Sequence, residues 1–118
     1  MNTTLGNTVR KKREALYRND KSFSLRQVAA RIDVQPSYLS RIERGEPLSL
    51  SEDKAIALAK ELSIDQNVML AMMGKVSKKL QAIIRRHPDA FAKLIKSLEK
   101  KKEHEVLEIV RVVRDGKW

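Results

Sequence analysis

Two short amphipathic segments separated by only three residues constrain the fold of this chain more than any other feature. Apolar side chains recur at helical spacing over residues 25–32 and again over 36–44. The residues between them, 33–35, allow only a tight turn. Ser24 suits the cap of the first helix, and Pro36 suits the first position of the second, where its missing N–H would be unpaired anyway. The sequence therefore predicts a helix-turn-helix.

The small side chain of Ala29 supports this prediction. Where two helices cross at a steep angle, the residue at the contact must be small. The larger apolar residues that we expect to fill the angle between the two helices are Val28, Ile32, Val34, Leu39 and Ile42.

Three further helices are predicted around this pair. The first spans about residues 5–18, with Leu5, Val9, Ala15, Leu16 and Tyr17 near a helical period. Another opens at Ser51 with Ile56, Ala59 and Leu62 inward, and the last is capped by Asp65 and runs through Val68, Leu70 and Met72 to Gly74. Together the five helices form one compact unit.

Charge and the lack of cysteine narrow the function. The 118 residues fit one small domain with an appendage, and the absence of cysteine excludes disulfides and thiolate metal sites. The net charge is +10, and residues 10–44 carry ten basic against four acidic side chains. Such an excess favours a polyanionic partner, and nucleic acid is the first candidate.

One stretch of the sequence resembles a known protein family. The stretch SLRQVAARIDVQPSYLSRIERGEP, with LGNTVRKKRE ahead of it, closely resembles the Cro/CI-type (XRE) helix-turn-helix family of phage and bacterial repressors. The resemblance covers roughly residues 5–74 and is most specific over 28–45. It implies an all-α fold in which residues 1–74 form a five-helix, lambda-repressor-like DNA-binding domain.

Two residues depart from the family pattern. Asp33 stands where relatives usually have glycine, and aspartate reaches left-handed backbone angles more easily than most residues. Pro36 stands at a position where relatives often carry a polar side chain that reads bases, and a proline ring offers no hydrogen bond for such readout.

The resemblance also implies which side chains contact DNA. The second helix of the motif fits the major groove, and its side chains outside the inward set face the base edges. The expected base contacts are Gln35, Ser37, Ser40 and Arg41. Glutamine pairs with adenine and arginine with guanine. A phosphate contact is the alternative for Arg41.

Phosphate contacts are expected from the start of the first helix of the motif and from the end of the second. The candidates are Ser24, Arg26, Gln27, Tyr38 and Arg44. Ser24 caps its helix in either case. For Tyr38 two alternatives stay open: the hydroxyl contacts a phosphate, or the ring only staples the domain surface. The resemblance further implies a structural ion pair between Arg13 and Glu43, with a surface pair of no consequence as the alternative.

Residues 75–118 lie outside the resemblance. Three apolar stripes predict about three amphipathic helices, with breaks near residues 87–88 and 100–102. A segment this small rarely folds alone, so it either folds back or, as we favour, joins the same segment of a second chain. The expected dimer interface consists of Phe91, Leu94, Ile95, Leu98, Val106, Ile109, Val110 and Val113.

The predicted function is that of a sequence-specific transcriptional regulator of double-stranded DNA, a repressor that binds an inverted-repeat operator as a homodimer. The alternative is an antitoxin-type or peptidase-controlled autoregulator whose C-terminal helices bind a partner protein. A basic amphipathic protein of membrane surfaces or RNA would explain the charge but not Ala29 or the turn.

The sequence shows no pattern typical of an enzyme, a metal site or a membrane protein. His87 and His104 have carboxylates beside them, but a lone solvated histidine is commoner than a ligand or a base. We expect no enzyme, no metal and no cofactor. The first 14 residues lack the apolar run of a signal peptide, and no run of about 18 apolar residues occurs, so we expect a cytoplasmic protein without a membrane span.

Overall fold

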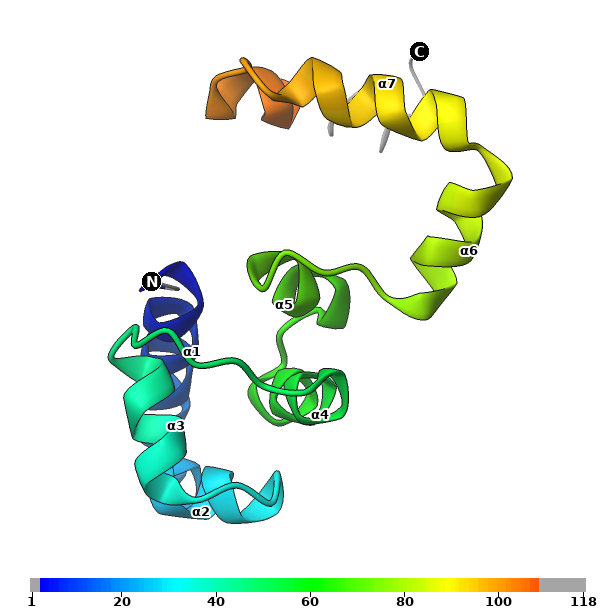
Figure 1. The fold of residues 1–118 in the computed structure, drawn as a ribbon. Helices are drawn as coiled ribbons and strands as arrows, with labels where there is room; N and C mark the ends of the chain where they lie inside the picture. Colours follow the sequence, from blue (N-terminus) through cyan, green and yellow to red (C-terminus); the bar gives the residue numbers. More distant parts are fainter. Residues whose placement is uncertain (1–2, 109–118) are drawn as a thin grey trace. The chain divides into compact units, whose positions relative to one another are not determined.

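The computed structural model of the chain describes residues 3–108 (Figure 1). Every regular element within that range is a helix, which confirms the all-α prediction. Contacts along the chain divide it into two units, Met1–Ser77 and Lys78–Trp118, and each is described by itself.

The first unit contains the helix-turn-helix. Its elements are α1 (Thr3–Tyr17), the short 3-10 helix η1 (Lys21–Phe23), α2 (Leu25–Arg31), α3 (Pro36–Glu43), α4 (Glu52–Leu62) and α5 (Gln66–Met72). Side-chain oxygens of Ser24, Ser51 and Asp65 accept hydrogen bonds from the first turns of α2, α4 and α5. These caps fix where the three helices begin. The η1 turn was not predicted, and Asp20 caps it through the N–H of Ser22.

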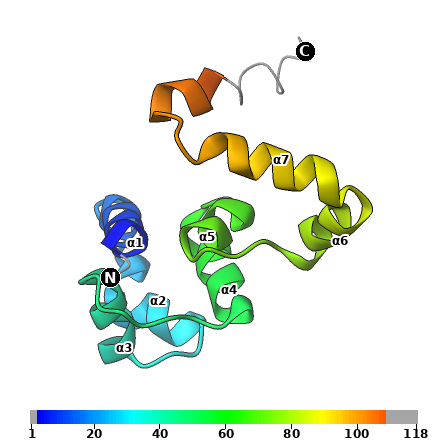
Figure 2. The same ribbon diagram turned by 45° about the horizontal axis from the view of Figure 1, so that its top comes forward.

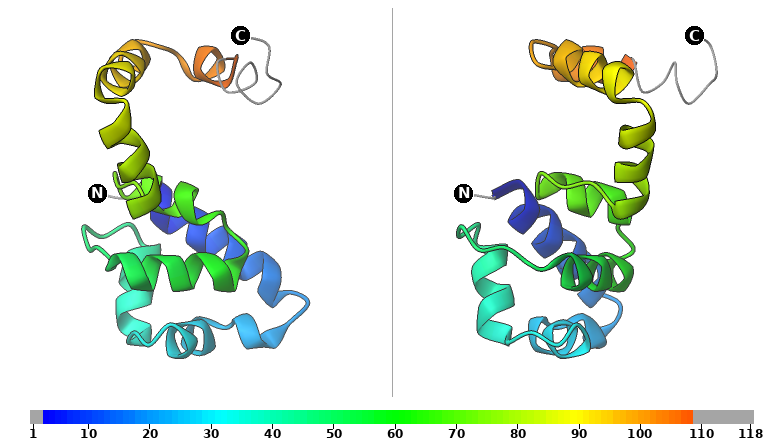
Figure 3. Two further views of the ribbon diagram at one scale, coloured as in Figure 1. Left: turned by 90° about the vertical axis from the view of Figure 1, so that its right-hand side faces the viewer. Right: turned by 45° about the vertical axis from the view of Figure 1, so that its right-hand side comes forward.

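The hydrophobic core is built from side chains of α1 to α5 and from Leu50 in the loop before α4. α1 contacts α3, α4 and α5, while α2 contacts α3 and η1. α3 leaves α2 at a steep angle (Figures 1 and 2), and Ala29 is fully buried, as predicted. The buried set is Leu5, Val9, Val28, Ala29, Ile32, Leu39, Ile42, Leu50, Ala55, Leu58, Ala59, Leu62, Met69 and Leu70. This packing leaves α3 at the edge of the unit (Figure 3).

Three residues differ from the expected apolar faces. Val68 is 52 % exposed, whereas Met69 and Leu70 are fully buried. A helix turns by about 100° per residue, so Val68 and Leu70 lie on nearly opposite sides of α5. Because Leu70 packs into the core, Val68 faces outward. Ala15 and Tyr17 were expected on the inward stripe of the first helix, but both are exposed, Tyr17 by 37 %.

The second unit consists of amphipathic helices. α6 (Lys78–Arg86) and α7 (Pro88–Leu98) contact each other, and a further helical stretch covers residues 103–108. The two breaks fall where the sequence predicts them. No described residue of this unit is fully buried, and Leu94 and Ile95 on α7 are 49 % and 48 % exposed. Phe91, Leu98 and Val106 are half-buried, while Ile109, Val110 and Val113 lie outside the described residues.

Candidate nucleic-acid interface

α3 has one buried and one exposed face. Leu39, Ile42 and Glu43 point into the domain, as the sequence predicts for the first two. Ser37, Ser40, Arg41 and Arg44 are three or four residues apart and therefore share the opposite face. Ser40 is half-buried and the other three are exposed. Gln35, also exposed, caps the start of the helix without a side-chain hydrogen bond.

The end of α3 is fixed by a glycine. Gly45 has φ +81°, a conformation that glycine adopts without steric cost. Its N–H donates to the carbonyl oxygen of Ile42 at 2.9 Å, and the N–H of Glu46 donates to that of Arg41 at 3.2 Å. These two hydrogen bonds are those of a Schellman motif. The motif therefore places Glu46 directly beside the last turn of α3.

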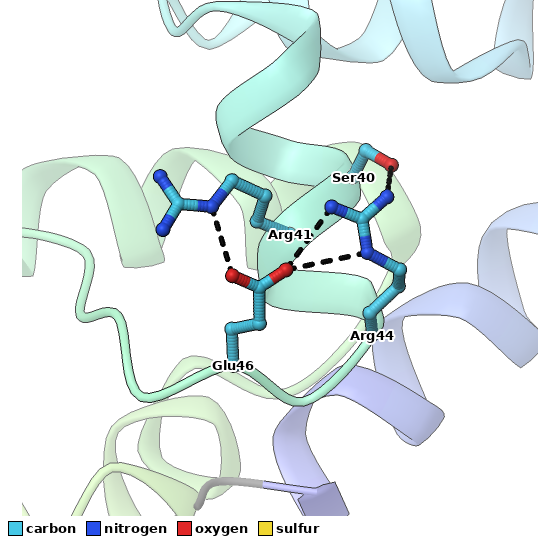
Figure 4. Close-up of polar contacts among 4 residues, drawn as sticks. All are labelled: Ser40, Arg41, Arg44 and Glu46. Atoms are coloured by element: carbon cyan, nitrogen blue, oxygen red, sulfur yellow. Dashed lines mark hydrogen bonds and ion pairs between the residues drawn. The ribbon is translucent and has the colours of Figure 1, made fainter.

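Glu46 lies between two arginines of that turn (Figure 4). Its Oε1 accepts from Nε of Arg41 at 2.9 Å, and its Oε2 accepts from Nη2 and Nε of Arg44 at 3.0 and 3.3 Å. The remaining Arg44 nitrogen, Nη1, donates to Oγ of Ser40 at 3.0 Å. The hydrogen bonds from Arg41 and Arg44 lower the pKa of Glu46. Three predicted contact residues thus form one polar cluster around a carboxylate.

Sequence reasoning missed Glu46. Its position directly after the predicted helix stop at Gly45 was the available signal, since a residue there returns to the last helical turn. The role of its carboxylate emerges only from the geometry of the turn.

The start of α2 holds the other predicted backbone contacts. Oγ of Ser24 accepts from the N–H of Gln27 at 3.2 Å. The amide nitrogen of Gln27, in the orientation that satisfies its neighbours, donates to the carbonyl oxygens of Lys21 and Ser22 at 3.0 and 3.1 Å. The side-chain N–H groups of Gln27 are thus bound to the backbone of its own domain. Arg26 is exposed.

Tyr38 is tied to the loop after α3. Its ring packs against the core, and its hydroxyl donates to the carbonyl oxygen of Ser49. In this arrangement the hydroxyl proton is used within the domain, as in the stapling alternative considered above.

Arg13 on α1 and Glu43 on α3 face each other inside the domain. Arg13 Nε and Nη2 donate to Glu43 Oε2 and Oε1 at 2.7 and 2.9 Å, and Arg13 Nη1 donates to the carbonyl oxygen of Phe23 at 3.3 Å. Glu43 is only 5 % exposed. The hydrogen bond to Glu43 raises the pKa of Arg13. This bidentate pair connects α3 to α1.

The turn between α2 and α3 depends on Asp33. Its φ is +58°, the left-handed angle expected where relatives carry glycine. Its carboxylate lies 3.4 Å from Nζ of Lys54 on α4. A left-handed residue here reverses the chain within the three residues available.

The comparisons with known proteins agree with this geometry over part of the chain. A model of the helix-turn-helix family matches residues 15–65, from the end of α1 to the cap of α5. No curated protein and no solved structure matches the chain. Within residues 3–108, no helix combines the length and the apolar composition needed to cross a membrane.

Proposed function

Because residues 15–65 form a helix-turn-helix domain of the Cro/CI (XRE) type, we propose that the chain regulates transcription by binding specific double-stranded DNA sequences through the outer face of α3. The observation that carries this proposal is the exposed row of Ser37, Arg41 and Arg44 opposite the buried face of the same helix. A helix at the edge of its domain can enter the major groove, where each base pair presents a distinct pattern of donors and acceptors.

Each residue on the outer face of α3 and at its two caps has a chemical role in this proposal. Arg41 reads guanine through two N–H groups, and Gln35 reads adenine at the start of the helix. Ser37 and Ser40 tolerate either base, and Arg44 can contact a phosphate only when it leaves Glu46. Arg26 and the first turn of α2 supply a further phosphate contact.

We further propose that the C-terminal segment, residues 75–118, brings two chains together. Leu94 and Ile95 expose apolar surface on α7, and Phe91, Leu98 and Val106 are half-buried in the same unit. Burying these side chains against a second copy would remove apolar surface from water. Two linked domains would then read two half-sites, which favours an inverted repeat. A regulator bound at such an operator acts as a repressor where it excludes other proteins from the promoter.

Selection of bound duplexes from a random pool tests this function. The expected result is enrichment of one sequence arranged as an inverted repeat. A direct repeat would contradict the symmetric dimer, and equal recovery of all sequences would contradict sequence-specific binding. If the chain sediments as a monomer alone but as a heteromer with a co-purifying toxin or peptidase, the C-terminal segment belongs to a partner-binding autoregulator instead.

A further inference from the structure

The carboxylate of Glu46 binds different parts of its two arginine partners. It takes only Nε of Arg41, and the two terminal nitrogens of that guanidinium point away from Glu46 (Figure 4). In contrast, Nε and Nη2 of Arg44 donate to Glu46, and Nη1 donates to Ser40. The two terminal nitrogens of Arg41 therefore stay available for a base, while every nitrogen of Arg44 is engaged within the cluster.

The backbone of Glu46 is fixed at both of its polar groups. The N–H donates to the carbonyl oxygen of Arg41 at 3.2 Å, and its own carbonyl oxygen accepts from the N–H of Leu48 at 2.7 Å. The side chain is 33 % exposed, less than that of Arg41 at 48 % or Arg44 at 59 %. The carboxylate thus extends from a backbone that is fixed by hydrogen bonds on both sides.

We propose that Glu46 is a positioning residue that sets the specificity of DNA binding: it orients Arg41 toward bases and withholds Arg44 from phosphates. The inference rests on the proposed DNA-binding function. Guanine is read by two N–H groups of one guanidinium, and an arginine already oriented through Nε loses less rotamer freedom on binding. A phosphate contact from Arg44 would strengthen binding to every sequence alike. Both effects of Glu46 raise the ratio of specific to non-specific affinity.

The test compares Glu46→Gln with the wild type on the selected duplex and on a scrambled duplex of equal length. We expect tighter binding of the scrambled duplex and a loss of about tenfold in the ratio of the two affinities, the scale of one base contact. Glu14→Gln is the matched control, because it makes the same charge change at an exposed position of α1. It should leave the ratio unchanged.

Two further variants separate the parts of the proposal. Glu46→Asp keeps the charge but shortens the side chain, so it should lower the ratio although the local charge is unchanged. Arg44→Ala in the Glu46→Gln background should abolish the gain on the scrambled duplex and leave the weakened base choice. Circular dichroism melting of each variant checks that the domain is folded.

The outcomes distinguish this inference from the function on which it rests. If the wild type prefers no duplex, the proposed function fails. If the wild type is selective but Glu46→Gln keeps the wild-type ratio, or if Glu14→Gln lowers it equally, the role of Glu46 is wrong. A change confined to the base position read by Arg41 supports the proposal, since a general loss of stability would weaken all positions together.

Discussion

Gly6 shows how a single residue limits the approach of two helices. A Cβ atom at this position would collide with the carbonyl oxygen of Ile42 and lie 2.9 Å from that of Glu43. Both acceptors belong to the backbone of α3, so neither can move aside without moving the helix. The close contact between α1 and the end of α3 therefore requires glycine at position 6.

We expect Gly6→Ala to lower the free energy of unfolding by about 1–3 kcal/mol, the cost of overpacking, although alanine is the better helix former. Urea denaturation measures the change. Asn7→Ala, at the exposed neighbouring position of α1, is the control and should be neutral or stabilising. A more stable Gly6→Ala would show that the two helices separate freely at this contact.

Glu46 should titrate below the usual range of a glutamate. The hydrogen bonds from Arg41 and Arg44 stabilise its ionised form, so its pKa in the folded protein lies below its unfolded value. Its contribution to stability is therefore present above the unfolded pKa and lost as the pH falls through the folded one. NMR titration of the side-chain carboxyl carbon measures this midpoint. Arg44→Ala should raise it, and an unchanged midpoint would argue against the cluster.

The connection between helices α1 and α3 depends on Arg13 and Glu43. Removing either partner leaves the other charge poorly solvated, so Arg13→Ala and Glu43→Ala should each cost about 3 kcal/mol of unfolding free energy. The double variant should lose clearly less than the sum of the two, because both remove one shared interaction. Thermal or urea unfolding of all four proteins gives the cycle. Strictly additive losses would mean that the pair contributes nothing as a pair.

The elements that were predictable from the sequence are those fixed by local chemistry. The helix-turn-helix is of this kind: Ser24 caps its first helix, Ala29 allows the two helices to touch, and Pro36 begins the second. The pairing of Arg13 with Glu43 could be predicted only from the family resemblance, because 30 residues separate them in the sequence.

Other features depend on geometry that the sequence pattern does not carry. Val68 fits a helical stripe in the sequence but is exposed, because the register of the short α5 is set by its packing. Glu46 is one acidic residue among 15, and only the turn at Gly45 brings it between two arginines. The base contacts themselves stay predictions.

For the intact protein, we expect two chains to bind each operator. Leu94→Ala combined with Ile95→Ala and Leu98→Ala keeps every charge and removes one apolar stripe of α7. This variant should sediment as a monomer and lose orders of magnitude in operator affinity, since separate domains each meet the full cost of association. Val68→Ala, an exposed apolar position of the first unit, is the control. A dimeric triple variant with unchanged affinity would reject this interface.

If the outer face of α3 reads bases, the effect of Arg41→Ala must depend on the DNA sequence, which titration on the selected duplex and its single-base variants measures. We expect specific binding to weaken by about 1–3 kcal/mol and discrimination to relax at one base position. Lys60→Ala, which removes the same charge from an exposed position of α4, should keep the wild-type discrimination at every position. An equal loss for Arg41→Ala on all sequences would contradict the claim and make Arg41 a phosphate contact.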